Sequence, residues 1–162
     1  MIAKKKAKRP AAAKKAVKKA AKSAGASRPA YPPIRPTPKG LRATERLRKL
    51  CLALPEVTER LSHGEATWFI QGKKSFVMMS DHHHNDRLAV TCMGADGAQE
   101  VLVATQPDKF YRPPYVGHLG WLGIYLDVPN VDWDQIADLI VEAYRRAAPA
   151  KLVDRLDRSD GA

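Results

Sequence analysis

The sequence predicts an α+β fold, in which helices pack on one face of a mostly antiparallel sheet, preceded by a disordered basic arm. Two observations predict the domain: residues 41–152 begin and end with apolar residues at helical spacing, and short apolar runs separated by turn residues lie between them. A third observation predicts the arm, because residues 1–40 hold ten Lys and three Arg but no Asp or Glu. The other 122 residues are enough for one domain with its own core.

The first helix is predicted near residues 44–54. Its apolar side chains follow the spacing i, i+3, i+4 and i+7: Leu47, Leu50, Cys51 and Leu54. We expect Thr44 to cap its N-terminus, because a Thr hydroxyl accepts a hydrogen bond from the first turn. Pro55 is expected to end it.

Strands are predicted between residues 58 and 93. Residues 66–70 and 73–79 flank Gln71-Gly72, a hairpin signal in which glycine supplies a positive φ. Residues 87–93 are expected to form another strand, after a polar loop at residues 80–86.

A short helix and a further strand are expected next. Apolar spacing from Ala98 to Thr105 predicts a helix that Pro107 ends. Residues 121–126 alternate, which predicts a strand with Leu122, Ile124 and Leu126 facing the core.

The last helix has the clearest pattern. Its apolar stripe continues for three turns: Trp133, Ile136, Ala137, Ile140, Val141 and Tyr144. Asp132 and Gln135 have the spacing of a capping box, and Pro149 is expected to end the helix. Residues 153–162 mix acidic and basic side chains and are expected to form a frayed tail.

The arm is expected to be disordered when free and to bind nucleic acid. Like charges at i,i+4 oppose a helix in solution, and five prolines between residues 29 and 38 favour an extended spacer. A cationic segment without acids favours polyanions, through phosphate contacts that release counterions. The alternative is a solubilising tail. The side chains assigned to nucleic-acid binding are Lys4, Lys5, Lys6, Lys8, Arg9, Lys14, Lys15, Lys18, Lys19 and Lys22.

Four motifs of the domain resemble the MmcQ/YjbR family, and the likeness runs from about residue 44 to 152. They are Ser-His-Gly-Glu-Ala-Thr-Trp-Phe at 62–69, Gly-Lys-Lys-Ser-Phe at 72–76, Asp-His-His-His-Asn-Asp-Arg-Leu at 81–88, and Phe-Tyr-Arg-Pro-Pro-Tyr-Val-Gly-His-Leu-Gly-Trp-Leu-Gly at 110–123. The resemblance implies a CyaY-like fold and a DNA-binding protein with a double-wing arrangement of strands and loops. It implies no established reaction.

Within the domain, four cations are candidates for positioning DNA. Lys73 and Lys74 lie at a predicted hairpin tip, where a wing would touch the phosphate backbone. Arg87 and Arg112 are the other two. Exposed lysines in turns are also ordinary, and the 15 basic and 17 acidic residues of the domain give it a net charge of −2.

The histidines suggest a second kind of site. His82, His83 and His84 suggest a metal site, since neutral imidazole is a common ligand of transition metals. The preferred interpretation is a polar turn whose histidines form hydrogen bonds with loop carbonyls. His63 precedes Gly64 and is interpreted as a hydrogen-bonding residue rather than a base.

An aromatic cluster between residues 111 and 121 has two interpretations. Aromatic rings beside Arg and His stack bases or hold a phosphate-bearing ligand, or they cover the core. The cluster comprises Tyr111, Arg112, Tyr115, His118 and Trp121. From the histidines and this cluster together we predict a ligand pocket that is formed by His63, His82, His84, Tyr115, His118 and Trp121.

We expect a non-enzymatic protein of the bacterial cytoplasm or nucleoid that binds DNA, rather than RNA, largely independently of sequence. No cofactor, metal or catalytic residue is assigned. No apolar stretch approaches the roughly 20 residues that cross a bilayer, so no membrane partner is expected. Cys51 and Cys92 form no CxxC pair and are expected to be buried thiols in a reducing compartment. The alternative function is a small-molecule or metal-binding domain that uses residues 82–84 and 115–121.

Overall fold

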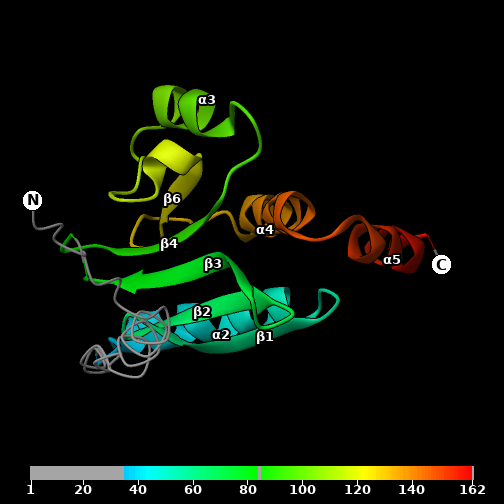
Figure 1. Ribbon diagram of the computed structural model, residues 1–162. Coiled ribbons are helices and arrows are strands. Elements are labelled where there is room, and N and C mark those ends of the chain that lie inside the picture. Colours follow the sequence, from blue (N-terminus) through cyan, green and yellow to red (C-terminus); the bar gives the residue numbers. More distant parts are fainter. Residues whose placement is uncertain (1–34, 84, 162) are drawn as a thin grey trace, which may run out of the picture. The chain divides into compact units, whose positions relative to one another are not determined.

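The computed structural model describes residues 35–83 and 85–161 (Figure 1). The predictions for arm residues 1–34 and for His84 lie outside this range. The described part contains one antiparallel sheet of six strands in the order β1-β2-β3-β4-β6-β5, which confirms the predicted α+β class. The strands are β1 (Val57–Ser62), β2 (Glu65–Ile70), β3 (Lys74–Asp81), β4 (Leu88–Met93), β5 (Phe110–Tyr111) and β6 (Trp121–Tyr125).

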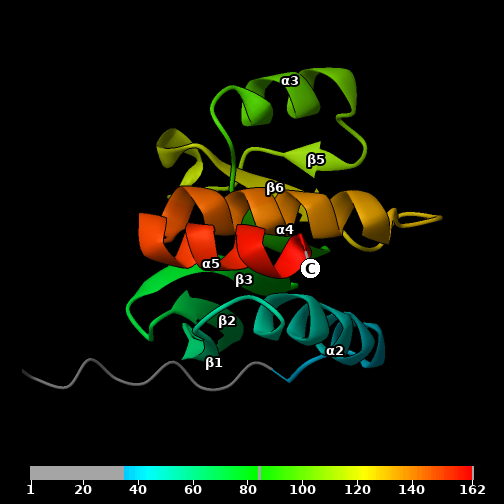
Figure 2. The same ribbon diagram turned by 90° about the vertical axis from the view of Figure 1, so that its right-hand side faces the viewer.

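Helices lie mainly on one side of this sheet. They are α2 (Pro38–Leu52), α3 (Ala98–Thr105), α4 (Trp133–Ala147) and α5 (Ala150–Asp160), together with the 3-10 turn η1 (Gly117–Leu119). Figure 2 shows α2, α4 and α5 in front of the strands, whereas α3 lies at the β5–β6 edge, with which it makes its contacts. None of the helices in the described ranges is long and apolar enough to span a membrane.

The core lies between the sheet and these helices. The Phe76 and Tyr144 rings meet edge to face with centroids 5.9 Å apart, and the Tyr144 hydroxyl donates to the Pro55 carbonyl at 2.9 Å. Large side chains with almost no exposure fill the core: Leu47, Trp68, Phe76, Met79, Leu122, Ile140 and Tyr144. The apolar stripes of the first and last predicted helices therefore supply one shared core.

The first helix begins earlier than predicted. Thr37, not Thr44, is the N-cap, because its hydroxyl accepts a hydrogen bond from the Gly40 N–H at 3.0 Å. Pro38 opens the helix at a position where no N–H donor is needed. The last of the prolines that predict an extended spacer, Pro38, is therefore the first residue of a helix.

The last predicted helix is confirmed, but the tail is not frayed. Asp132 caps α4 by accepting from the Gln135 N–H at 3.0 Å, as the capping spacing predicts. After Pro149 the chain forms α5, whose Leu152 and Leu156 are buried. Two leucines at i,i+4 among charged residues were too weak a pattern to predict a helix, and packing against the body supplies its stability.

The hairpin and the remaining strands match their predictions closely. Gln71 and Gly72 have φ values of 52° and 65°, so the β2–β3 turn has positive φ at both central positions. Strand β3 continues to Asp81, which lies in the segment predicted as a polar loop. The short helix at 98–105 and the strands at 88–93 and 121–125 lie where they were expected.

Both cysteines lie in the core as free thiols. Burial raises the pKa of Cys51, and it raises the pKa of Cys92 to about 12. Thiols with such raised pKa values are almost entirely protonated near neutral pH, so neither cysteine is suited to act as a nucleophile.

Candidate nucleic-acid interface

The solvent face of α2 carries a row of exposed cations. The row consists of Lys39, Arg42, Arg46 and Lys49, separated by three, four and three residues. This spacing puts them on one face of the helix, while Ala43, Leu47 and Cys51 are buried on the other. We call these four residues the basic stripe.

Sequence reasoning missed the basic stripe because it began the helix at Thr44. That boundary left Lys39 in the arm and Arg42 in the domain but ahead of the helix, so the four cations were never placed on one helical face. The signal was present in the spacing itself, and Thr37 followed by Pro38 is a recognisable helix start.

A buried carboxylate fixes the N-terminal end of α2. Asp81, 3% exposed at the end of β3, accepts hydrogen bonds from the Thr37 N–H at 2.7 Å and the Thr37 hydroxyl at 3.1 Å. A Cβ on Gly40 would lie 2.0 Å from the Asp81 carboxylate, so only glycine permits this approach. A negative charge at the helix N-terminus also interacts favourably with the helix dipole and stabilises the helix.

Arg87 is bound within the body. Its guanidinium donates to both Asp127 oxygens at 2.7 and 2.6 Å and lies 3.7 Å from the Tyr125 ring centroid. This hydrogen-bonded pair lowers the pKa of Asp127, and the nearby charge of Lys39 lowers it further. The Arg87 charge is thus balanced by Asp127, which is forty residues away in the sequence.

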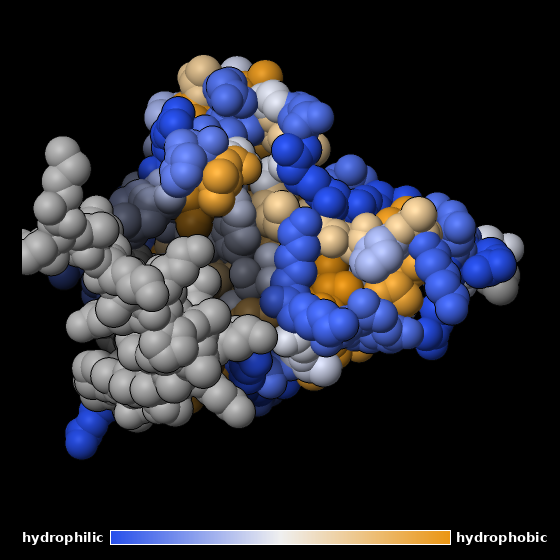
Figure 3. Space-filling model, in the orientation of Figure 1, coloured by the Kyte–Doolittle hydropathy of each residue, from blue (hydrophilic) through white to orange (hydrophobic). Residues whose placement is uncertain are grey.

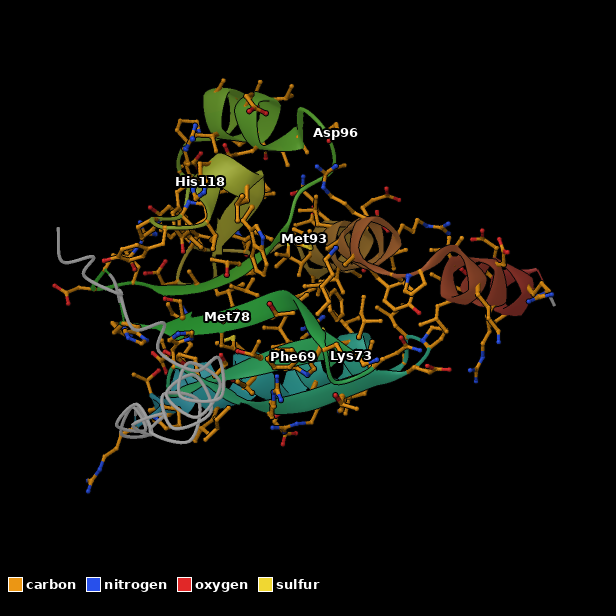
Figure 4. The ribbon with its side chains drawn as sticks, in the orientation of Figure 1. Phe69, Lys73, Met78, Met93, Asp96 and His118 are labelled. Atoms are coloured by element: carbon orange, nitrogen blue, oxygen red, sulfur yellow. The ribbon has the colours of Figure 1, made fainter. Side chains whose placement is uncertain are left out.

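Lys73 and Lys74 lie at the end of the β2–β3 hairpin, as predicted. Both side chains are exposed, and Figure 4 shows Lys73 on the turn that joins the two strands. Neither has an ion pair among the interactions of the described residues. They are available to an anion outside the body.

Arg112 lines a pocket of about 310 Å³ beside η1. His118 and the α4 residue Arg146 also line it, and Arg146 is ion-paired with Asp96 at its rim. Figure 4 shows His118 and Asp96 on separate segments near α3. Gln99 fixes the pocket wall, because its amide donates to the Gly117 carbonyl at 2.8 Å and to the Trp121 carbonyl.

The assigned ligand pocket divides into two distant groups. His82 follows Asp81, which pairs with Leu88 at one end of β4, whereas Trp121 pairs with Met93 at the other end. Six residues of strand separate these ends by about 17 Å. His63 lies in the β1–β2 turn next to Glu65, which accepts a hydrogen bond from the Asp81 N–H, so it is at the same end of the sheet as His82. Because His82 and Trp121 lie at opposite ends of β4, one small molecule does not reach both. His84 lies outside the described residues.

The histidine loop is tied to two buried carboxylates. The His82 Nδ1 lies 2.5 Å from an Asp81 oxygen, and the His83 Nδ1 lies 3.9 Å from Glu65. Burial raises the pKa of Glu65, which accepts a hydrogen bond from the Asp81 N–H at 2.8 Å. Within the described ranges, no three His, Cys, Asp or Glu side chains are arranged to hold a metal ion.

The two aromatic residues of the second group have different environments. Trp121 is 7% exposed, which agrees with its interpretation as a packing residue. Tyr115 is 80% exposed and has a φ of 66°, in the left-handed region that side chains seldom adopt. Its ring is presented to solvent beside the pocket segment.

Large exposed apolar side chains are distributed over several elements, with two of them, Leu41 and Leu52, on α2. They are Leu41, Leu52, Leu61, Val101, Tyr115 and Leu119. In Figure 3, apolar residues (orange) lie in small groups among hydrophilic ones (blue) over α3 and the α4–α5 region. The apolar residues on this face of the molecule therefore do not gather into one large docking surface.

Comparisons with known proteins agree with this fold. No curated protein matches the chain. The crystal structure of Deinococcus radiodurans protein DR2400, which has the domain DUF419, is similar at a TM-score of 0.52 and 17% identity, over 62% of this chain and 75% of that one. At this identity the likeness concerns the fold alone. The sequence matches the YjbR family over residues 52–146, more than half of its length, and the chain therefore belongs to the YjbR family.

Proposed function

We propose that this YjbR-family protein binds DNA largely independently of sequence, mainly through phosphate contacts of its basic arm. The observation that carries the proposal is the separation of charge: residues 1–40 contain 13 Lys and Arg and no acid. A segment of one sign has no internal partners for its charges. It gains most by neutralising phosphates and releasing their counterions.

The charges of the folded body support this division of labour. Five of its arginines are ion-paired with carboxylates of the body itself: Arg48, Arg87, Arg145, Arg146 and Arg155. Each pair balances the charge of its arginine within the body, so fewer unpaired cations remain for an external polyanion. The arm then supplies most of the affinity, and the body positions the duplex with its remaining cations.

The proposal is tested with the full-length chain and a variant in which ten arm residues become Gln: Lys4, Lys5, Lys6, Lys8, Arg9, Lys14, Lys15, Lys18, Lys19 and Lys22. Fluorescence anisotropy with a duplex of mixed sequence is measured from 50 to 300 mM salt. If about eight arm charges contact phosphates, the log–log salt slope of the variant is shallower by about 7. An unchanged affinity in the variant would reject the proposal.

A truncated protein for the same purpose begins at residue 35 rather than at residue 41. Thr37 caps α2 and binds Asp81, so removal of residues 1–40 would damage the body as well as the arm. Keeping residues 35–40 separates loss of binding from loss of structure.

A second candidate function is the binding of a small anion in the pocket beside η1. Arg112 and His118 line this pocket, whereas the charge of Arg146 is balanced by the lining residue Asp96. Glu100 also lines the pocket, so Arg112 is the side chain expected to hold an anion there. A thermal-shift screen with nucleotides and inorganic phosphate tests it, with Arg112→Gln as the variant expected to lose the shift. No stabilisation of the wild-type protein by any of these anions would exclude this function.

A further inference from the structure

We propose that the basic stripe of α2 is a rigid phosphate-binding surface for duplex DNA, which continues the arm into the folded body. This inference rests on the proposed function, since it assigns a second contact to the same partner. It concerns Lys39, Arg42, Arg46 and Lys49, none of which was assigned from the sequence.

The dimensions of the stripe suit a DNA backbone. From Lys39 to Lys49 the helix rises by about 15 Å. Along the duplex axis this length carries about nine phosphate charges on the two strands, so four cations have phosphates within reach on one side. Successive cations are separated by about 5 Å of helix rise, and their long side chains adjust to the remaining mismatch.

Helix α2 divides its five cations between structure and solvent. Arg48 points to the sheet, where it donates to both Glu59 oxygens at 2.8 Å and also pairs with Glu45 at 3.3 Å. Glu45 is the one acidic residue of α2, and its ion pair is with Arg48 rather than with a stripe residue. The four stripe residues have no ion pair within 4 Å among the described residues.

The stripe is preorganised by the packing beneath it. Leu47 and Cys51 have no exposed surface, and Asp81 holds the first turn through Thr37. The Arg46 guanidinium lies 4.7 Å from the centroid of the Trp133 ring, which restricts its conformations. A surface that is already ordered loses little conformational entropy on binding.

The stripe follows the arm directly in the sequence, and this connection strengthens both contacts. Residue 34, the last of the arm outside the described range, is four residues from Pro38. A duplex held by the arm is therefore kept at high effective concentration beside α2. The contacts of the stripe are too few to bind DNA alone, but they increase the affinity once the arm is bound.

Acidic residues limit the surface on two sides. Asp127 lies near Lys39 but is already bound to Arg87. Asp132 and Asp134 flank Trp133, on which Arg46 rests. Phosphates placed over α4 would meet these acids, so the duplex is restricted to the α2 side.

The test compares two full-length variants that each lose two Lys and one Arg. The stripe variant carries Lys39→Gln, Arg42→Gln and Lys49→Gln, and it keeps Arg46 because that side chain packs on Trp133. The control carries Lys109→Gln, Lys151→Gln and Arg158→Gln, which lie on other elements. At 0.1 M salt we expect at least tenfold weaker binding of a mixed-sequence duplex and a salt slope shallower by about 3 in the stripe variant alone.

Several outcomes would overturn the inference. Equal affinity and equal slope in the stripe and control variants would show that only net charge matters. Loss of binding to phosphatidylserine vesicles with retained DNA affinity would assign the stripe to a membrane. If the stripe variant is less stable in a thermal melt, the three single variants are measured, and each must reduce the slope by about 1.

The same measurements separate this inference from the proposed function. The arm variant tests the function, and the stripe variant tests the second contact. Normal binding by the arm variant rejects the function, whereas matched behaviour of the stripe and control variants rejects the stripe while the arm is retained.

Discussion

Helices α2 and α4 have the same length and opposite surfaces. Each has 15 residues and buries an apolar face in the shared core. The solvent face of α2 carries the basic stripe, whereas the solvent face of α4 carries Asp134, Asp138 and Glu142. Residues 41–162 have 15 basic and 17 acidic side chains, so their net charge is near zero although single faces are strongly charged. The net charge therefore says little about what any one face binds.

The largest expected effect follows from a substitution that disturbs the anchoring of α2 and leaves α4 unchanged. Gly40→Ala places a Cβ 2.0 Å from the buried Asp81 carboxylate. Alanine would otherwise favour the helix, but here we expect a loss of about 3 kcal/mol in the free energy of unfolding, the upper end for overpacked sites. Urea denaturation measures it.

Gly161→Ala is the matched control. Its Cβ would meet only the Asp157 carbonyl at 3.6 Å, and its φ of −95° suits alanine. We expect a change below about 0.5 kcal/mol for this exposed position. Equal stabilities of the two variants would contradict the close contact between Gly40 and Asp81.

The same contact explains why the sequence predicted α4 better than α2. Asp132 and Gln135 are local signals, and α4 begins where they place it. The start of α2 has a local signal in Thr37-Pro38, but Gly40 in its first turn discourages a helix. Its further support comes from Asp81, 41 residues beyond Gly40. No local pattern reports a partner at that separation.

The candidate site divides in the same way. The exposure of Lys73 and Lys74 follows from a local hairpin signal and was predicted. The pairing of Arg87 with Asp127 and the separation of His82 from His118 depend on strand register, which the sequence does not display.

The caps of the two helices provide a sharper comparison. Asp132→Ala removes one hydrogen bond from the first turn of α4, and we expect it to lower the free energy of unfolding by about 1 kcal/mol. Thr37→Ala removes the cap of α2 and also the hydroxyl bond to buried Asp81, so we expect about 2 kcal/mol.

Chemical denaturation of both variants tests this difference. Thr37→Ser, which keeps the hydroxyl, should recover most of the lost stability. An equal loss in the Asp132 and Thr37 variants would mean that the hydrogen bond from the Thr37 hydroxyl to Asp81 contributes nothing to the anchoring of α2.

The smallest expected effect concerns the acidic face of α4 and DNA. Neutralising it with Asp134→Asn, Asp138→Asn and Glu142→Gln removes three charges that repel phosphates. If DNA lies over α2, these acids act only through space and are partly screened at 0.15 M salt, where the Debye length is about 8 Å. We therefore expect roughly threefold tighter binding with a nearly unchanged salt slope, because no phosphate contact is gained.

The salt slope distinguishes this result from a change in docking. The control neutralises Glu100, Asp108 and Asp154, which are exposed residues on other elements, by the same kinds of substitution. If affinity depends only on net charge, both variants gain equally. A larger gain for the α4 variant places the duplex beside α4, and a slope that steepens by about 1 or more would mean that phosphates move onto α4 once its acids are removed.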